Sequence, residues 1–396
     1  MISYKNIFQA VCFLSNIFKG NLKPHLINEI DDQFVKKHIE TNLLKKSNDL
    51  NKLEIYLKQL YGANKQIQIT NSGRIALFYI LNSLKLNKGS QILIPSYSCF
   101  GLIQPIISSG NIPKFIDINR ELNPSFNSIK KSIDTNTKVL IYPYLGGNFS
   151  NDFFKIKELC KKKKIIFIED CCQAFGLKIK NRDVGIFSDI SFFSSGVGKP
   201  VFTPEGGWIL VNNPKVLNSA LPKLNIKNSD VYHLKEYKKF CKNFSNNYFK
   251  FSYNIIKDII ISMLQKNKTP FIKINDELNT ISNLSAAIIL QELRKNKSNI
   301  NKRETIARYW KNKIKDEDID LMMSELSIYN KFYVKSSLEV KRNFIASGIQ
   351  VENGYKPLHL RYDFAKYPKD DLKYTMQVWR YIYSLPTRPS LYNYLT

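Results

Sequence analysis

The sequence lacks the long apolar runs of membrane proteins and the high glycine and proline content of fibrous or disordered chains. Glycine (16) and proline (15) are sparse among its 396 residues, whereas hydrophobic residues make up 43%. This balance predicts a folded, globular protein. No run reaches the roughly 18 apolar residues of a membrane span, and polar residues interrupt the partly apolar stretch 2–18, which has no small-residue cleavage site. We therefore expect a soluble, cytoplasmic protein.

Closely spaced metal ligands are also missing. The sequence has six cysteines and four histidines, and neither set shows the paired spacing of a zinc site. We therefore expect no metal site and reduced thiols.

Acidic residues are scarce, with 33 Asp and Glu against 60 Lys and Arg, for a net charge of +27. Such a charge favours nucleic acids and other phosphate-bearing partners. The lysines are spread over the whole chain, however, including positions such as 161–164 at the end of a predicted helix, which is typical of a coding bias. We therefore expect no nucleic-acid partner.

Short β-branched runs alternate with helical patterns between residues 66 and 213. The runs at 66–70, 91–94, 112–118, 138–142, 165–169, 189–194 and 207–212 predict strands. Apolar residues at helical spacing predict helices at 74–86, 102–108 and 152–164. This alternation indicates an α/β fold with a mostly parallel seven-stranded sheet.

The length suggests about two domains, and the pattern changes along the chain. We predict an N-terminal helical segment at 1–65, a large domain at 66–213, a basic, aromatic-rich segment at 214–281 and a small C-terminal α/β domain at 282–396. For the last, helices are expected at 282–296, 302–313, 336–347 and 370–383, with a strand near 329–334.

Aromatic residues alternate with lysines at 232–273. Such a segment could stack on nucleic acid, contact a membrane surface or bind a nucleotide-linked sugar. The fourth interpretation is a helical insertion that packs on the protein's own surface, and we favour it because such stripes are usually core.

Polar and glycine-rich loops follow four of the predicted strands, at 71–73, 95–100, 169–173 and 194–200. Ligands bind beyond the carboxyl ends of the strands of an open parallel sheet. Asn71-Ser72-Gly73 suits an anion at a helix N-terminus, or is an ordinary helix cap.

Asp170 and Lys199 are the candidate chemical groups of these loops. Asp170 ends an apolar run, so its carboxylate needs a cation to offset the cost of burial. Lys199 lies in a glycine-bounded loop, where a lowered pKa would suit Schiff-base chemistry. The alternative for either residue is a salt bridge at the surface.

The combination resembles the DegT/StrS-type sugar aminotransferases, which are pyridoxal 5'-phosphate enzymes of fold type I. The resemblance extends from about Leu57 to the terminal Ser384-Leu385-Pro386. It is carried by four ordered motifs: Asn71-Ser72-Gly73, Glu169 through Gly176, Ser194 through Pro200, and Glu205-Gly206-Gly207.

The resemblance implies a role for each matching residue. Lys199 would bind the cofactor as a Schiff base and move the proton of the reaction, Asp170 would hold the pyridine nitrogen protonated, and Gln173 would contact the phenolic oxygen. The phosphate would be held by Ser72, Gly73, Arg74 and Ser194. Some relatives replace the lysine by histidine and are dehydratases, so Lys199 favours transamination.

Two positions depart from the family pattern. The family's ring-stacking aromatic residue is replaced here by Cys99, followed by Phe100, and Arg74 replaces a small residue, which adds charge to the phosphate site.

The resemblance further implies a homodimer that transfers an amino group from an amino-acid donor, glutamate by analogy with the family, to a nucleotide-linked keto-sugar for polysaccharide or glycoconjugate biosynthesis. Two alternatives stay open: a transaminase with a different acceptor, and a catalytically silent basic binding protein. A peripheral membrane contact is not favoured.

Overall fold

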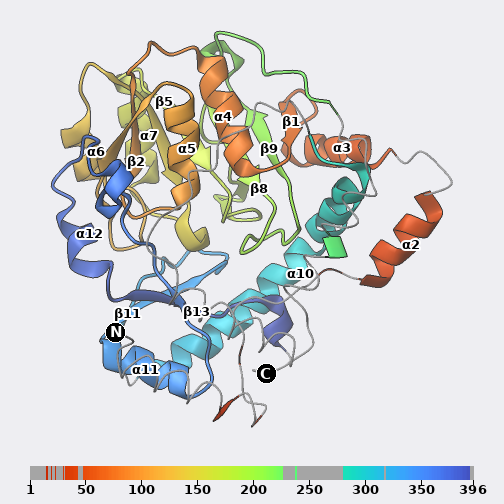
Figure 1. The fold of residues 1–396 in the computed structure, drawn as a ribbon, viewed down its shortest axis with the longest axis vertical. Helices are drawn as coiled ribbons and strands as arrows, with labels where there is room; N and C mark the ends of the chain where they lie inside the picture. Colours follow the sequence, from red (N-terminus) through yellow and green to blue (C-terminus); the bar gives the residue numbers. More distant parts are fainter. Residues whose placement is uncertain are drawn as a thin grey trace.

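The computed structural model describes residues 32–42, 48–225, 280–315 and 318–392, together with a few isolated positions. Its centre is a seven-stranded sheet in the order β1-β9-β8-β5-β4-β2-β3 (Figure 1). The strands are β1 (Gln66–Thr70), β2 (Gln91–Pro95), β3 (Ile112–Ile116), β4 (Thr137–Pro143), β5 (Ile166–Asp170), β8 (Ile190–Ser194) and β9 (Gly207–Val211). Only the pairs formed by β9 are antiparallel. The predicted fold class and the seven predicted strands are confirmed.

The sheet is apolar on both faces because alternate residues of each strand point to opposite sides. In β4, Val139 and Ile141 join one buried cluster with residues of α4 (Gly73–Leu84) and α5 (Ile103–Ser108). Leu140 and Tyr142 join a second cluster on the other face. That cluster also contains residues of α3 (Asp49–Tyr61), α6 (Phe126–Ser132) and α7 (Phe153–Lys162). Two helical layers therefore cover the sheet.

A second, antiparallel sheet has the order β10-β11-β13-β12. Its elements are β10 (Ile319–Leu321), β11 (Phe332–Ser336), β12 (Glu352–Asn353) and β13 (Ile382–Leu385), with α11 (Leu338–Ala346) and α12 (Lys373–Val378) beside it. The predicted helix at 370–383 is wrong in its last turn. Residues 382–385 are all buried and pair with β11, so sheet pairing overrides the helical pattern there.

The two helices predicted at 282–296 and 302–313 are one helix, α10 (Asn283–Lys313, 31 residues). No glycine or proline interrupts it, and the Ser282 hydroxyl caps it by accepting from the amide of Ser285 at 3.1 Å. Ile289 packs in the core of the large sheet, whereas Trp310 packs in the core of the small one. Figure 1 shows α10 running from the side of α3 down to the small sheet. This helix therefore connects the core of the large sheet with the core of the small sheet.

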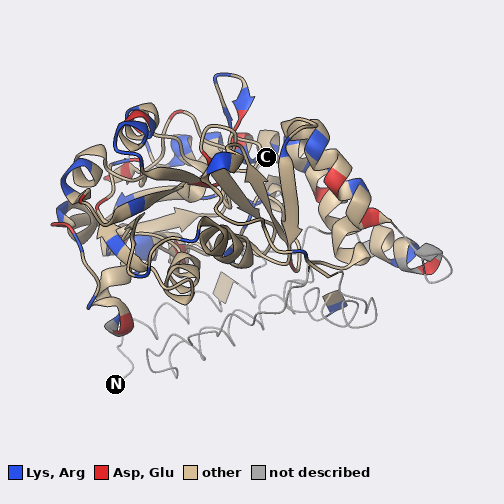
Figure 2. Cartoon of the chain, turned by 90° about the horizontal axis from the view of Figure 1, so that it is seen from above, with Lys and Arg blue, Asp and Glu red and all other residues tan. Residues whose placement is uncertain are grey.

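The helix α6 and the hairpin of β6 (Lys178–Ile179) and β7 (Arg182–Asp183) were not predicted, whereas α2 (Asp32–Asn42) lies in the N-terminal segment that was predicted to be helical. Most of the aromatic-rich stretch 232–273 lies outside the described residues, so its predicted packing and the boundaries of the 214–281 segment stay predictions. Over the described part, Lys and Arg are spread among many elements (Figure 2). None of the helices in that part is long and apolar enough to cross a membrane.

Candidate active site

A cavity of about 310 Å³ opens at the carboxyl ends of the parallel strands. Loops after β1, β2, β4, β5 and β8 line it, as expected for an open parallel sheet. The structure brings together eight of the nine predicted site residues in its wall: Ser72, Gly73, Arg74, Cys99, Asp170, Gln173, Ser194 and Lys199. Segments separated by more than a hundred residues therefore meet at one place.

The N-terminus of α4 forms one end of the cavity. The Ser72 hydroxyl caps the helix by accepting from the amide of Ile75 at 3.3 Å. A Cβ atom at Gly73 would lie 2.8 Å from the Cβ of Ser194 and 2.9 Å from the Sγ of Cys172, so a larger residue does not fit. The first amides of a helix lack internal partners and carry positive partial charge. This end can therefore hold an anion at close range.

Two polar atoms beside this end are buried and have no hydrogen-bond partner among the described residues: the Nε of Arg74 and the Oγ of Ser98. Both residues line the cavity. Unpaired buried polar atoms are costly and rare in native proteins. Together with the helix N-terminus, these two donors fit a phosphate group.

Asp170 ends β5 beside this anion-binding end. Its Oδ1 accepts from the amide of Cys172 at 3.0 Å, and the residue is 8% exposed. Burial raises the pKa of this carboxyl, and the nearby charge of Lys199 lowers it in part, so that the net shift is upward. A buried carboxylate in this position is stabilised by a cation in the cavity. A protonated ring nitrogen would be such a cation.

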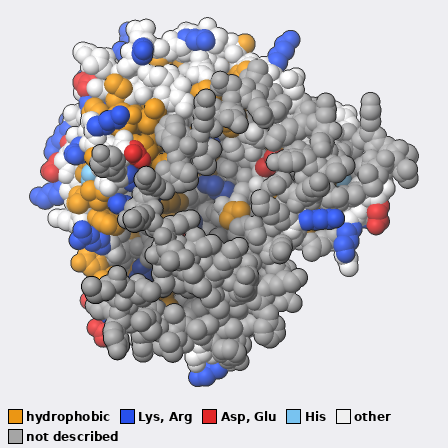
Figure 3. Space-filling model, in the orientation of Figure 1, with side chains coloured by type: hydrophobic (Ala, Val, Ile, Leu, Met, Phe, Trp, Pro, Cys, Tyr) orange, Lys and Arg blue, Asp and Glu red, His pale blue; other side chains and the backbone are white. Residues whose placement is uncertain are grey.

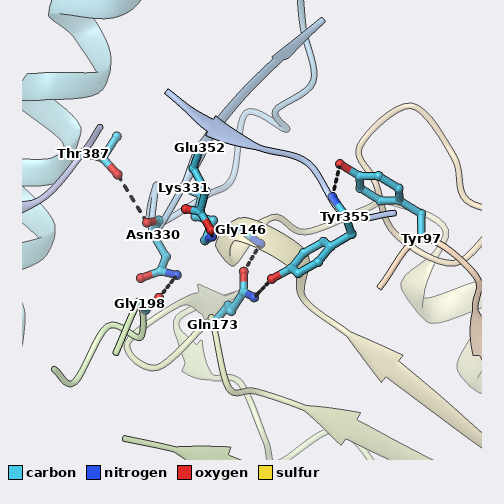
Figure 4. Close-up of polar contacts among 9 residues, drawn as sticks. All are labelled: Tyr97, Gly146, Gln173, Gly198, Asn330, Lys331, Glu352, Tyr355 and Thr387. Carbon is cyan, nitrogen blue, oxygen red and sulfur yellow. Dashed lines mark hydrogen bonds and ion pairs between the residues drawn. The ribbon is translucent and has the colours of Figure 1, made fainter. Parts of the chain in front are cut away.

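The backbone of Lys199 is held from two sides. Its amide donates to the carbonyl of Gly196 at 3.1 Å, and its own carbonyl accepts from Nη1 of Arg388 at 2.9 Å. The preceding carbonyl, of Gly198, accepts from the side chain of Asn330 at 3.1 Å (Figure 4). These contacts fix the base of the side chain while it faces the cavity.

The pKa of Lys199 is shifted in the direction opposite to the sequence-based expectation. Burial lowers its pKa, but the groups around it raise that pKa by more: Cys172, Cys99, Asp170 and Glu352. The expected lowered pKa is therefore wrong. The sequence shows the glycines beside Lys199 but not the acidic groups that the fold brings near it.

Gln173 is fixed at both ends of its amide. Its Oε1 accepts from the amide of Gly146 at 2.8 Å, and its Nε2 donates to the hydroxyl of Tyr355 at 3.1 Å (Figure 4). The amide of Tyr355 in turn donates to the hydroxyl of Tyr97 at 3.3 Å. One Nε2 hydrogen of Gln173 stays available for a ligand oxygen.

Phe100 is the predicted residue that does not line the cavity. Its ring packs against the ring of Phe364 at 5.7 Å between centroids. The guanidinium of Arg361 lies 5.1 Å from the centroid of the Phe100 ring. Cys99 does line the cavity, and its Sγ accepts from the amide of Gly101 at 3.4 Å. The one-residue step between them turns Phe100 to the other side of its short 3-10 helix.

Sequence analysis missed the aromatic residues of the wall, Tyr144 and Phe192. The Tyr144 hydroxyl donates to Glu169 at 2.6 Å, and this buried carboxylate also accepts three backbone amides, from Gly185, Phe187 and Ser188. Tyr144 follows β4, whose carboxyl end lies at the same rim. The position of Tyr144 shortly after a predicted strand could therefore have placed it at the cavity.

Comparisons with known proteins identify the family and the fold of the chain. The model of the DegT/DnrJ/EryC1/StrS aminotransferase family matches residues 25–394. A GDP-perosamine synthase from Vibrio cholerae is 27% identical over 174 residues, which are 44% of this chain and 46% of the relative. The aligned part thus spans about half the length of that curated relative.

Solved structures with this architecture cover nearly the whole chain. The aminotransferase PseC of Helicobacter pylori, involved in the biosynthesis of pseudoaminic acid, has a TM-score of 0.71 and 19% identity, covering 93% of this chain and 94% of its own. GDP-4-keto-6-deoxy-D-mannose-3-dehydratase of E. coli, with bound hydrated PLP, has a TM-score of 0.70 and 21% identity, covering 94% and 97%. At these identities the likeness shows the fold.

Proposed function

The chain belongs to the DegT/DnrJ/EryC1/StrS aminotransferase family, and from that premise we propose that it is a pyridoxal 5'-phosphate-dependent aminotransferase. Its substrates would be an amino-acid donor, taken here as glutamate, and a keto-sugar linked to a nucleotide. The relative whose name includes a GDP-sugar supports this acceptor class. The product would be an amino-sugar for polysaccharide or glycoconjugate synthesis.

One observation carries this proposal: Asp170 and Lys199 face one cavity whose other end is a helix N-terminus. The cavity thus offers an acid for a ring nitrogen, an amine for an aldehyde carbon and an anion site for a phosphate. A salt bridge at the surface, the alternative for either residue, does not explain why all three converge. Neither does it explain the unpartnered Arg74 and Ser98 atoms.

The residues of the cavity fit the cofactor group by group. The phosphate would lie on the α4 amides of Gly73 and Arg74 with the hydroxyls of Ser72 and Ser194. Gln173 would donate to the phenolic oxygen, and Asp170 would keep the ring nitrogen protonated. When bound, pyridoxal phosphate supplies an electron sink for negative charge at the substrate carbon that bears nitrogen.

The chain's own groups then bind, orient and move a proton. Lys199 Nζ would hold the cofactor and afterwards transfer the proton at the amine-bearing carbon of the substrate. The contacts of Arg388 and Asn330 to the backbone of residues 198–199 keep this nitrogen over the cavity. Tyr144 and Phe192 supply apolar wall area that excludes water from the reacting atoms. Lys199, in place of histidine, favours transfer over dehydration.

We also propose that the enzyme acts as a cytoplasmic homodimer. Isologous dimers are the commonest assembly of soluble enzymes. Hydrophobic side chains gather on one face of the molecule over the region of α5 (Figure 3). Ile107 of α5 and Phe100, which precedes this helix, are only partly buried. Such patches are typical of contact surfaces. Light scattering at micromolar concentration tests this, and an active monomer would contradict the proposed dimer.

Labelling of Lys199 tests the proposed function directly. The purified chain is mixed with pyridoxal phosphate, its visible absorption is recorded, and the sample is reduced with borohydride. Peptide mapping is expected to place the pyridoxyl group on Lys199. The matched control is Lys331→Arg, which replaces a second buried lysine whose pKa the charge of Lys199 lowers, and which leaves Lys199 in place. Label on another lysine, or no label, would overturn the assignment.

A further inference from the structure

A second lysine, Lys331, lies beside the proposed site but does not line the cavity. It directly precedes β11, and its amide donates to the carbonyl of Gly146 at 3.2 Å. Its ammonium lies 5.9 Å from the ring centroid of Tyr355, the residue that holds Gln173. Figure 4 shows Lys331, Tyr355 and Gln173 grouped where the two sheets meet.

The ion pair of Lys331 with Glu352 is unequal in its exposure. The Lys331 side chain is 8% exposed, whereas the Glu352 side chain is 39% exposed. A buried ammonium requires an anion close by, because its desolvation is otherwise uncompensated. The Glu352 carboxylate, in contrast, keeps part of its hydration within the pair. The cation is therefore held in the interior, whereas its anion reaches the surface, where another carboxylate could take its place.

The surroundings of Lys331 strengthen this demand for an anion. Burial lowers its pKa, Glu352 raises it, and the charges of Lys199 and Arg388 lower it again. Arg388 contacts the backbone of Lys199 directly, so the three cationic residues belong to one neighbourhood. Exchange of Glu352 for another carboxylate keeps this neighbourhood neutralised, whereas loss of the carboxylate does not.

We propose that Lys331 binds a carboxylate of a substrate, and that Glu352 occupies this subsite until the substrate replaces it. This inference rests on the proposed function, since transamination brings an amino acid to a place near Lys199. The carboxylate would belong to the amino-acid donor or to a sugar acid used as acceptor. Both sources present the same group to Lys331.

An ordinary structural ion pair makes the opposite prediction. If Glu352 competes with substrate, its neutralisation frees Lys331 and strengthens carboxylate binding. If the pair only stabilises the small sheet, its neutralisation loosens the sheet and leaves carboxylate binding unchanged or weaker. Whether carboxylate binding becomes stronger or weaker when Glu352 is neutralised therefore distinguishes a substrate subsite from a structural ion pair.

The experiment measures equilibrium binding of glutarate and of D-glucuronate to the cofactor-loaded chain by intrinsic fluorescence. For Glu352→Gln we expect binding of at least one probe to tighten about tenfold, the scale of a hydrogen bond to a charged group. For Lys331→Met we expect it to weaken by about tenfold or more. The matched control is Asp320→Asn, which neutralises the carboxylate paired with Lys335 at 2.5 Å in the same sheet and should change nothing.

The two probes identify the source of the carboxylate. Tighter glutarate binding in Glu352→Gln assigns the subsite to the donor, and tighter glucuronate binding assigns it to the acceptor. Unchanged or weaker binding of both probes would overturn the proposal, even if Lys331→Met fails to fold. Borohydride labelling of Lys199 in the same Glu352→Gln protein keeps the outcomes distinct, since a labelled protein without the binding change refutes only this subsite.

Discussion

The two sides of the cavity are built from different kinds of contact. On the α4 side, Ser72 and Gly73 follow one strand and Ser194 ends another, so each position is set by the end of its own strand. On the side of the small sheet, Gln173 is held by Tyr355, 182 residues away, and the Lys199 carbonyl by Arg388, 189 residues away. The comparison teaches that the anion-binding end is set by the large sheet alone, whereas the placement of Gln173 and Lys199 also depends on residues that flank the strands of the second sheet.

The largest effect is expected where the two sides meet, at Asp170. Asp170→Asn should leave cofactor binding measurable but reduce the transamination rate by several orders of magnitude, because a neutral amide cannot keep a ring nitrogen protonated. Single-turnover kinetics with absorption detection measures both quantities. Asp152→Asn, on the surface of the same domain, is the matched control. A rate near that of the unchanged protein would give the carboxylate another role.

A second prediction addresses the α4 side alone. Gly73→Ala should weaken binding of pyridoxal phosphate by about tenfold to a hundredfold, since overpacking costs about 1–3 kcal/mol and the new Cβ meets Ser194 and Cys172 at 2.8 and 2.9 Å. Spectroscopic titration measures the dissociation constant. Gly101→Ala is the control, because its nearest contact would be an ordinary 3.5 Å. Equal effects of the two variants would show that the close approach is unimportant.

A third prediction addresses the small-sheet side. Tyr355→Phe removes the oxygen that accepts from Nε2 of Gln173. A hydrogen bond is worth about 1 kcal/mol, so we expect a severalfold loss of rate and a shift in the pH dependence of the cofactor's absorption. Tyr381→Phe, which alters a hydroxyl on an exposed ring, is the control. An unshifted absorption profile would mean that Gln173 is oriented without Tyr355.

This contrast also explains what could be predicted from the sequence. The seven strands, and most residues at their carboxyl ends, follow from alternation and from the rule that such loops share one rim. The side chain of Phe100 could not be placed, because one step in a 3-10 turn decides which side it faces. The raised pKa of Lys199 and the last strand, β13, depend on partners distant in sequence. Periodicity carries no information on either.

The smallest expected effect concerns the stability of the protein without cofactor. It shows whether the burial of Asp170 in the cavity lowers the free energy of unfolding. Burial raises the pKa of Asp170 in the folded protein, whereas the pKa in the unfolded chain is about 3.9. At pH values between these two pKa values, the folded protein therefore binds more protons than the unfolded chain. Stability without added cofactor should therefore decrease as the pH increases through this window. Asp170→Asn removes the titrating group and should melt at a higher temperature than the unchanged protein at pH 7.

Thermal melts without cofactor at pH 7 and at about pH 3.5 measure this difference, which should shrink at the lower pH because Asp170 is then mostly protonated in both states. Asp152→Asn again serves as the control for a lost surface carboxylate. Added pyridoxal phosphate should reverse the order of the two proteins, since a cation beside the carboxylate offsets its burial only when the carboxylate is present. A variant that melts lower at pH 7 without cofactor would show that Asp170 is already stabilised by the fold itself, and the cavity would then not require a cationic ligand.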